Sequence, residues 1–428
     1  MTIASQTPNN ETGPKPGVIS VLSQWNYGVY TAGSTISLFG LWAHRLAAAW
    51  LAWELTHSSF WVGMVAFADL IPTLFLTPFA GVIADRYDRR YLAIISQVMG
   101  MVQALVLGWM YLKGYLAEAS DIWWLVGWTL FLGIAWALNT AARLSMVPNL
   151  VEHNFIPPAV ALNSAIFNLG RVVGPPVGAW IIFEWNVGIA FIFNAATFVF
   201  FIAALLVIRA VRTEEKPASG VGMMVQLKEG IKHTVIHPGL GPAMVLLIAM
   251  AMGGKALFEV LPEFSAEVFS RDVMGLGEMT GASGIGGLIA AILLAQRGPV
   301  QGLTRITIFA LLLTGLCIFG FVATTWYPLA ILSCFVLGIT GIYGGTATQI
   351  LMQHAVDGAM RGRVMSLYGV IHRGAPAIGA LAMGAAAEFI GIRWSVALGG
   401  VLCLGTWMWM LTRSQTVAAA LEKEHQSD

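Results

Sequence analysis

The feature that most constrains this chain is a succession of long apolar segments separated by short polar connections. A helix needs about 20 apolar residues to cross the hydrocarbon core of a bilayer, and it satisfies its backbone polar groups internally. Segmenting at charges, prolines and glycines gives twelve candidates, at residues 27–55, 60–83, 91–112, 123–146, 159–183, 188–210, 240–263, 275–296, 303–323, 327–350, 363–387 and 393–412. The pattern predicts an all-α membrane protein with twelve transmembrane helices.

Composition indicates that lipid is the main solvent of this chain. Hydrophobic residues make up 57% of the sequence and charged residues 11%, which leaves few polar side chains to cover a soluble surface. The net charge of +1 argues against a nucleic-acid partner. Cys317, Cys334 and Cys403 lie inside apolar runs without disulfide or metal-ligand spacing. We therefore expect no cofactor and no metal, and we expect the lipid bilayer as a partner.

The loop cations predict the orientation. With both termini in the cytoplasm, sixteen of the 23 Lys and Arg residues lie on the cytoplasmic side, three lie outside, and four lie within spans. This asymmetry follows the tendency of cytoplasmic loops to carry Lys and Arg. The polar N-terminus lacks the basic start and apolar core of a cleaved signal, so the first membrane helix is expected to direct insertion.

The spans divide into two halves. The predicted organisation is a cytoplasmic tail (1–26), a six-helix half (27–210), a cytoplasmic linker with an amphipathic helix (211–239), a second six-helix half (240–412) and a C-terminal cytoplasmic tail (413–428). The stretch NSAIFNLGRVVGPPVGA from Asn163 echoes MSLYGVIHRGAPAIGA from Met365 at a constant offset of 201 residues. Parallel repeats of this kind are a known transporter architecture with a substrate site between the halves.

Two motifs resemble those of the major facilitator superfamily. The stretch GVIADRYDRR, Gly81 to Arg90, resembles the signature of its loop between spans two and three, and GRVVGPPVGA resembles its antiporter motif with Ala179 in place of the final glycine. The order of these motifs with SLFGLWAHRLAAAWLAWELT resembles the branch of bacterial efflux proteins that contains the enterobactin exporter. The loop after span eight, AQRGPVQGLTR, lacks the Asp and the arginine pair of the first-half motif.

The resemblance implies a function as well as a fold. The superfamily implies two pseudo-symmetric six-helix halves, rocker-type alternating access and secondary transport. The branch implies proton-coupled export of a mid-sized organic solute, such as a siderophore or a drug-like molecule. It also implies a monomer in the bacterial inner membrane that binds a small-molecule substrate and protons.

The loop motif is expected to act as a conformational latch. Asp85 can accept hydrogen bonds at a helix N-terminus, and in the superfamily the matching acid faces the start of span eleven, which carries Arg361 and Arg363 here. The residues assigned to this latch are Gly81, Asp85, Arg86, Arg89 and Arg90. The alternative is that the arginines only set the topology.

The antiporter-like motif is expected to serve packing or gating. Gly170, Gly174 and Gly178 recur every four residues and form a groove for close helix approach, while Pro175 and Pro176 remove backbone donors. The residues assigned to this motif are Gly170, Arg171, Gly174, Pro175 and Gly178. A tightly packed, bent helix can seal one face of a rocking bundle, and ordinary small-residue packing is the alternative.

Charged and titratable residues inside spans predict a central cavity. A charge at the centre of a span costs about 2.5 to 3.5 kcal/mol on insertion scales, so such residues tend to face a cavity or a partner. The cavity and coupling candidates are His44, Arg45, Asp69, Lys255, Glu259, His372 and Arg373. Arg45 and Asp69 lie at matching depth in adjacent spans, which predicts a direct pair, and Lys255 and Glu259 share one face at a spacing of four.

Asp69 and Glu259 are the better candidates for proton carriers, because burial can bring protonation of a carboxylate into the working range. His44 and His372 are the other candidates, since imidazole titrates there without perturbation. Four basic residues against two acids within the spans suit an anionic substrate. The alternative is that these charges are structural ion pairs that lock helices together.

Other function classes stay open or are disfavoured. Import, or transport of another solute such as a metal chelate, fits the same helices. A membrane enzyme would need a catalytic or metal-ligand constellation, which the sequence lacks, and no Walker loop indicates ATP as the energy source. A receptor or scaffold on the same fold is a further alternative, because fold does not fix function.

Overall fold

The fold consists entirely of helices in the residues described by this computed structural model, which are 18–86, 88–208 and 223–422. The first group of helices comprises α1 (Val18–Leu22), α2 (Trp25–Thr56), α3 (Ser59–Arg86), α4 (Arg89–Leu112), α5 (Ile122–Met146), α6 (Ile156–Glu184) and α7 (Val187–Val207). Short 3-10 turns occur at Ala119–Asp121, Val147–Leu150 and His153–Phe155. All six long helices cover predicted spans, with ends that differ by a few residues.

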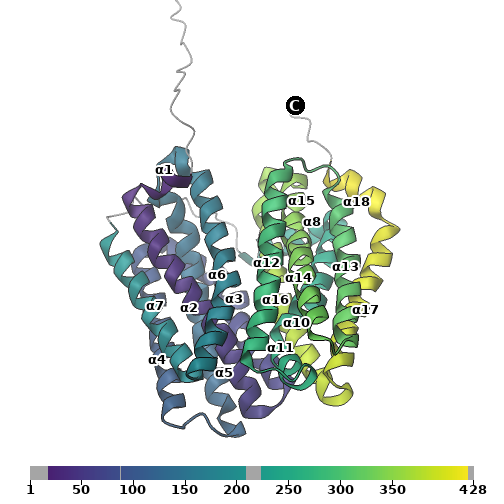
Figure 1. Cartoon of the computed structure of the whole chain (residues 1–428). Coiled ribbons are helices and arrows are strands. Elements are labelled where there is room, and N and C mark those ends of the chain that lie inside the picture. Colours follow the sequence, from purple (N-terminus) through teal and green to yellow (C-terminus); the bar gives the residue numbers. More distant parts are fainter. Residues whose placement is uncertain (1–17, 87, 209–222, 423–428) are drawn as a thin grey trace, which may run out of the picture.

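The second group follows the connecting helix α8 (Met223–Ile236). It comprises α9 (Leu240–Ala249), α10 (Ala256–Glu259), α11 (Leu261–Glu263), α12 (Val273–Arg297), α13 (Leu303–Ala323), α14 (Tyr327–Ile342), α15 (Thr348–Ala355), α16 (Gly358–Ile390), α17 (Ile392–Leu411) and α18 (Ser414–Leu421). Figure 1 shows the two groups side by side, with the described ends of the chain at the same end of the molecule.

Two of the spans are interrupted by π-helix. The seventh runs from α9 through η4 (Met250–Lys255) into α10 and α11, and is followed by η5 (Phe264–Val268). The tenth runs from α14 through η6 (Tyr343–Ala347) into α15. Such π segments occur frequently at functional sites in helices. The sequence pattern predicted neither interruption.

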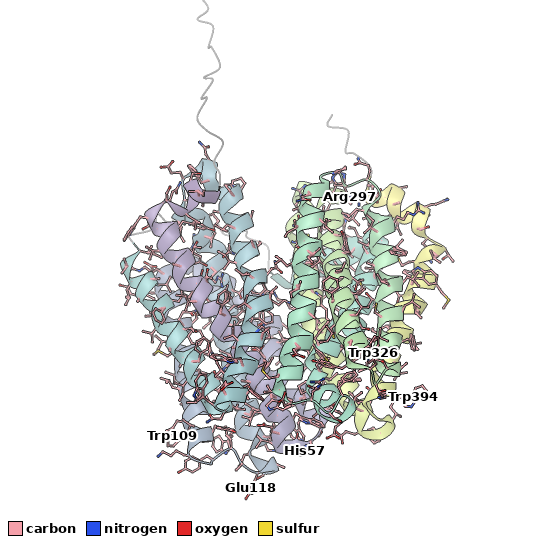
Figure 2. The ribbon with its side chains drawn as sticks, viewed as in Figure 1. His57, Trp109, Glu118, Arg297, Trp326 and Trp394 are labelled. Atoms are coloured by element: carbon pink, nitrogen blue, oxygen red, sulfur yellow. The ribbon has the colours of Figure 1, made fainter. Side chains whose placement is uncertain are left out.

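Ten helices are long and apolar enough to cross a membrane within the described part of the chain. The two other long helices, α2 and α16, are less apolar because α2 carries His44 and Arg45 and α16 carries His372 and Arg373. Together they complete the twelve transmembrane helices, so the predicted fold class is confirmed. Trp109, Trp326 and Trp394 are exposed toward the end away from the termini, as in an aromatic belt at a membrane surface (Figure 2).

The two groups meet along two helix pairs. The helix α3 packs against α16, and α6 packs against α12. Close approaches lie in the half of each helix away from the termini, where Gly63 faces the Ala380 carbonyl and Gly281 faces the Pro176 side chain. Toward the described ends of the chain the two groups diverge (Figure 1). The molecule is therefore closed at the end opposite its termini.

The helix α8 is attached to the second group. Glu229 forms an ion pair with Arg363 at the start of α16, at 2.5 Å, and Gly230 lies against the backbone of the same arginine. At the end of α8, His237 accepts hydrogen bonds from the backbone N–H groups of Gly239 and Leu240 at its Nδ1. Burial lowers the pKa of His237, which suits a neutral imidazole that accepts these bonds. The predicted domain boundaries and the surface position of α8 remain predictions.

Candidate functional site

A cavity of about 400 Å³ lies between the two groups of helices. Its walls come from α2, α3, α5 and α6 on one side and from the seventh span, α12 and α16 on the other. All seven predicted cavity residues line it, namely His44, Arg45, Asp69, Lys255, Glu259, His372 and Arg373. Charges within membrane-spanning helices are costly unless they face partners, a cavity or a ligand, so this cavity is the candidate site.

Arg45 and Asp69 form a direct ion pair, as their matching depth predicted. The Nη2 of Arg45 lies 2.9 Å from Oδ2 of Asp69. The guanidinium also lies over the rings of Trp42 at 5.1 Å and Trp136 at 5.8 Å from the ring centroids. Cation–π contacts of this kind are strongest when the cation is desolvated. The charge of Arg45 is therefore held by one carboxylate and two indole faces.

Lys255 has a different kind of partner. Its Nζ lies 3.2 Å from Nε2 and 3.4 Å from Nδ1 of His372. The same imidazole stacks on Tyr368, whose hydroxyl lies 3.0 Å from Nδ1. Because Lys255 is the last residue of η4, the π segment sets the position of its side chain. Tyr368 thus holds the imidazole of His372, and this imidazole holds the ammonium group of Lys255.

The imidazole of His44 contacts side chains of the first group of helices, although His44 also lines the cavity. Its Nε2 lies 3.3 Å from Nε2 of Gln103 on α4, and its ring packs on Phe191 of α7 at 4.8 Å. His44 is almost completely buried. The structure therefore places this imidazole in the interior packing of the first half.

The remaining charges are close to one another without forming short pairs. Glu259 lies within electrostatic range of Arg45, Asp69 and Arg171, and Arg171 lies within range of Lys255. Among the described residues of the cavity, the Arg45–Asp69 contact is the one ion pair within 4 Å. Lys255 and Glu259 share the cavity, as predicted, but Lys255 bonds to His372.

The antiporter-like motif occupies α6 with its glycines on the face toward α2. The glycine groove accommodates Leu38 and Trp42 beside Gly170, the Phe39 carbonyl beside Gly174 and the Ala43 backbone beside Gly178. The helix continues without a break through Pro175 and Pro176. Arg171 and Pro175 also line the cavity. The groove therefore packs helices within one half, and the gating role of the motif stays a prediction.

The loop motif is only partly described. The structure describes Gly81, Asp85 and Arg86 as part of a helix but does not describe their side-chain surroundings, so the latch remains a prediction. Asp88 caps α4 by accepting a hydrogen bond from the backbone N–H of Arg90 at 2.8 Å. Arg90 also donates to the Leu206 carbonyl at 2.5 Å, and Arg89 is half-buried at the start of α4.

The closed end contains hydrogen bonds that the sequence did not reveal. Ser58 donates to Glu388 of α16 at 2.5 Å, and Ser59 donates to Glu263 of α11. Both serines stand at the N-terminus of α3, where the helix dipole favours carboxylates. These bonds join the two halves. No local pattern predicts them, because each pair is separated by more than 200 residues.

Some cavity residues had a readable signal. Trp42 lies three residues before Arg45, and Tyr368 lies four before His372, so helical spacing places each on the face of its partner. Trp136 had no such signal, because it reaches Arg45 from α5. Helical spacing therefore indicates an aromatic partner on the same helix as a charge, but not one on a neighbouring helix.

The arrangement defines a class of protein: a multi-pass membrane transporter with the major facilitator fold and a charged cavity between its halves. A family model described as "Transmembrane secretion effector" matches residues 18–426. The chain therefore belongs to this family of the major facilitator superfamily, and the resemblance noted from the motifs is confirmed.

Curated relatives are transporters of bacteria. The chain is 24% identical over 388 residues to the staphyloferrin A transporter of Staphylococcus aureus (strain NCTC 8325 / PS 47), covering 90% of this chain and 96% of that protein. It is 24% identical to macrolide efflux protein A of Streptococcus pyogenes, covering 89% and 95%. It is 25% identical to the enterobactin exporter EntS of Escherichia coli O1:K1 / APEC, covering 77% of each.

Solved structures share the fold at low sequence identity. A bacterial homolog of the human lysosomal transporter Spinster, in an inward-facing and unoccupied conformation, superposes with a TM-score of 0.72 at 14% identity, covering 96% of this chain and all of that one. A D-xylose–proton symporter superposes with a TM-score of 0.64 at 17% identity, covering 91% and 97%.

Proposed function

We propose that this protein is a proton-coupled exporter of a mid-sized organic solute, of the siderophore or drug-like kind. The observation that carries the proposal is the charged cavity between the two helical halves. The close contacts between the halves that are described above lie at the end opposite the termini. Relatives named for staphyloferrin A, enterobactin and macrolides support this solute class.

We place the protein in the bacterial inner membrane as a monomer, with both termini in the cytoplasm. In that orientation the closed end is outermost and the cavity is reached from the cytoplasm. An exporter needs such a state to load its solute before the halves rock to the opposite arrangement. The excess of cations in the loops on the side of the termini supports this orientation.

Proton coupling is assigned to Asp69 in contact with Arg45. The pair is short and lies in the wall of the cavity. Both residues belong to the first half, so the coupling that we propose includes a movement of α2 against α3 within that half, which would separate the charges. A carboxylate stays ionised beside a guanidinium and takes up a proton more readily when that cation moves away. Glu259 lies within electrostatic range of the same pair and is the second carboxylate available for coupling.

Everted membrane vesicles test direction, substrate and coupling together. Vesicles with this protein should accumulate one of three solutes, a macrolide, enterobactin or staphyloferrin A, when respiration supplies a proton gradient. A protonophore should abolish the accumulation. Accumulation only in right-side-out vesicles would show import, and accumulation that survives the protonophore would remove the proton from the mechanism.

A further inference from the structure

We propose that the cavity binds a small organic polyanion through a subsite formed by Arg171, Lys255 and Arg373. This inference rests on the proposed function, in which the cavity holds the transported solute. Four cations and two acids line the cavity. The protein already neutralises some of these charges and leaves others without an acidic partner.

Arg45 is matched. It has Asp69 at 2.9 Å, and the rings of Trp42 and Trp136 cover its guanidinium. The carboxylate neutralises the charge of Arg45, and the indole rings lie over its guanidinium. A ligand would have to break an existing ion pair to use Arg45 as its main binding group. The subsite therefore lies among the other three cations.

Lys255 is held without being neutralised. An ammonium group has donors only, so the His372 imidazole accepts its hydrogen bond at 3.2 to 3.4 Å. Tyr368 then fixes the imidazole by stacking and by a hydroxyl contact at 3.0 Å. Protein interiors usually pair a buried lysine with a carboxylate. Here the partner is an imidazole, which leaves the ammonium charge available to a ligand.

Arg171 and Arg373 complete the subsite. Within the described residues neither guanidinium has an acid within 4 Å. Arg171 lies within electrostatic range of Lys255 and His372, and Arg373 lies beside His372 in α16. Glu259 is the other acid that lines the cavity, so the formal charges of the three cations and Glu259 sum to +2. Among the described residues these three cations have no acid within 4 Å, and an anion in the cavity would compensate their charges.

The cations come from both halves. Arg171 belongs to α6 in the first half, whereas Lys255 and Arg373 belong to η4 and α16 in the second. An anion between them would contact both halves at once, and its binding would depend on how the halves are arranged.

The expected ligand carries two or more carboxylate or catecholate groups. Such groups accept the paired donors of a guanidinium in the geometry that arginine offers. A cavity of about 400 Å³ accommodates a small organic molecule, and its remaining walls are largely apolar, including Phe167, Leu132 and Phe258. Two excess charges match a dianion better than a monoanion.

The test compares binding of citrate with binding of its neutral triamide by calorimetry, using the purified full-length protein in lipid nanodiscs. We expect the wild type to bind citrate and not the triamide. His372→Glu places a carboxylate beside Lys255, so it should weaken citrate binding by at least about ten-fold. His372→Gln keeps an uncharged acceptor and should bind citrate within a few-fold of the wild type. Lys255→Gln should resemble His372→Glu.

Arg413→Gln serves as the matched control, because Arg413 is exposed and stacks on Trp409 outside the cavity. It should leave citrate binding unchanged. Equal binding of citrate and triamide, no citrate binding by the wild type, or unchanged binding by both His372→Glu and Lys255→Gln would overturn the proposal. Sodium sulfate at equal ionic strength should give no comparable heat, and an equal response would mean unspecific anion binding and would also overturn it.

The vesicle assay separates failure of this inference from failure of the proposed function. If the vesicles export one of the solutes but the purified wild type does not bind citrate, transport stands and the polyanion subsite falls. If citrate binds as expected but the vesicles move none of the solutes against a gradient, the subsite stands and gradient-driven export falls.

Discussion

At the scale of single residues, the protein holds two of the cavity cations, Arg45 and Lys255, in different ways. Arg45 is paired with a carboxylate and covered by indole rings, whereas Lys255 is bound to an imidazole. An ion pair that opens during the transport cycle suits proton exchange. A cation without a carboxylate suits ligand binding. The two roles are therefore assigned to different residues.

Asp69→Asn is expected to abolish solute accumulation driven by a proton gradient, because the amide cannot carry a proton between the two states. Binding of solute and passive exchange should persist, since the subsite cations are unchanged. The measurement is uptake by everted vesicles at equal protein level, with and without a gradient. Full gradient-driven uptake by a well-expressed Asp69→Asn protein would leave Glu259 as the carrier.

The exchanged pair Arg45→Asp with Asp69→Arg is the control for a structural role. If the pair only locks α2 to α3, each single change should lower the amount of protein and the exchange should restore transport. Restored transport would therefore contradict a role in coupling. Normal protein level without transport in the exchanged variant would support that role.

At the scale of helices, α6 uses two faces for two kinds of contact. The glycine face, Gly170, Gly174 and Gly178, packs against α2 inside the first half. The face with Val172, Pro176 and Ala179 packs against Gly284, Gly281 and Gly277 of α12 in the other half. The first face should determine the stability of the half. The second should determine how firmly the two halves stay closed.

Gly174→Ala is expected to destabilise the protein, because the new Cβ would lie 2.9 Å from the backbone oxygen of Phe39. Overpacking of this kind costs about 1 to 3 kcal/mol, which should appear as a lower Tm of the purified protein. Gly127→Ala on α5 is the matched control, because its Cβ would meet no atom within 4 Å. A Tm for Gly174→Ala equal to that of the control would contradict the packing assignment.

At the scale of the whole molecule, the halves are joined at the closed end by Ser58 with Glu388 and by Ser59 with Glu263. Each bond links the N-terminus of α3 to an acid of the second half. A hydrogen bond to a charged group contributes about 1.5 to 3 kcal/mol, which is enough to shift a balance between two arrangements of similar free energy. These bonds should favour the arrangement that is closed at the end opposite the termini.

Ser58→Ala combined with Ser59→Ala is expected to raise the fraction of molecules that are open at this end. Spin labels at Glu118 and Trp394, which lie at the closed end in different halves, report the separation by pulsed electron resonance (Figure 2). The double variant should populate longer distances than the parent. Ser414→Ala is the control, because its hydroxyl donates to the Leu411 carbonyl within the same half. An unchanged distance distribution would show that packing alone closes this end.

The orientation of the molecule gives a further prediction. A single cysteine at Asp88 should react with an impermeant reagent only from the cytoplasmic side, and one at Glu118 only from outside, in a background without Cys317, Cys334 and Cys403. These positions lie in successive connections, on opposite sides of α4. Labelling of Asp88→Cys in intact cells would reverse the proposed orientation.

The sequence by itself determined the twelve spans, their approximate ends and most of the charged residues that line the cavity. Span length is a local property, because the thickness of the hydrocarbon core sets it directly. Charges inside spans are also visible locally, and their cost predicts that they gather around a cavity. The Arg45–Asp69 pair was accessible as well, because depth in two adjacent helices can be counted from their ends.

Only the tertiary structure decided which partners the other residues find. Lys255 bonds to His372 and not to its helical neighbour Glu259, because η4 sets its direction and α16 supplies the imidazole. The glycine face of α6 turns toward α2, and Ser58 and Ser59 meet acids of the other half. These outcomes depend on helix rotation and on contacts between segments far apart in the chain. A local sequence pattern records neither, because it fixes the face of a helix without fixing the neighbour toward which that face turns.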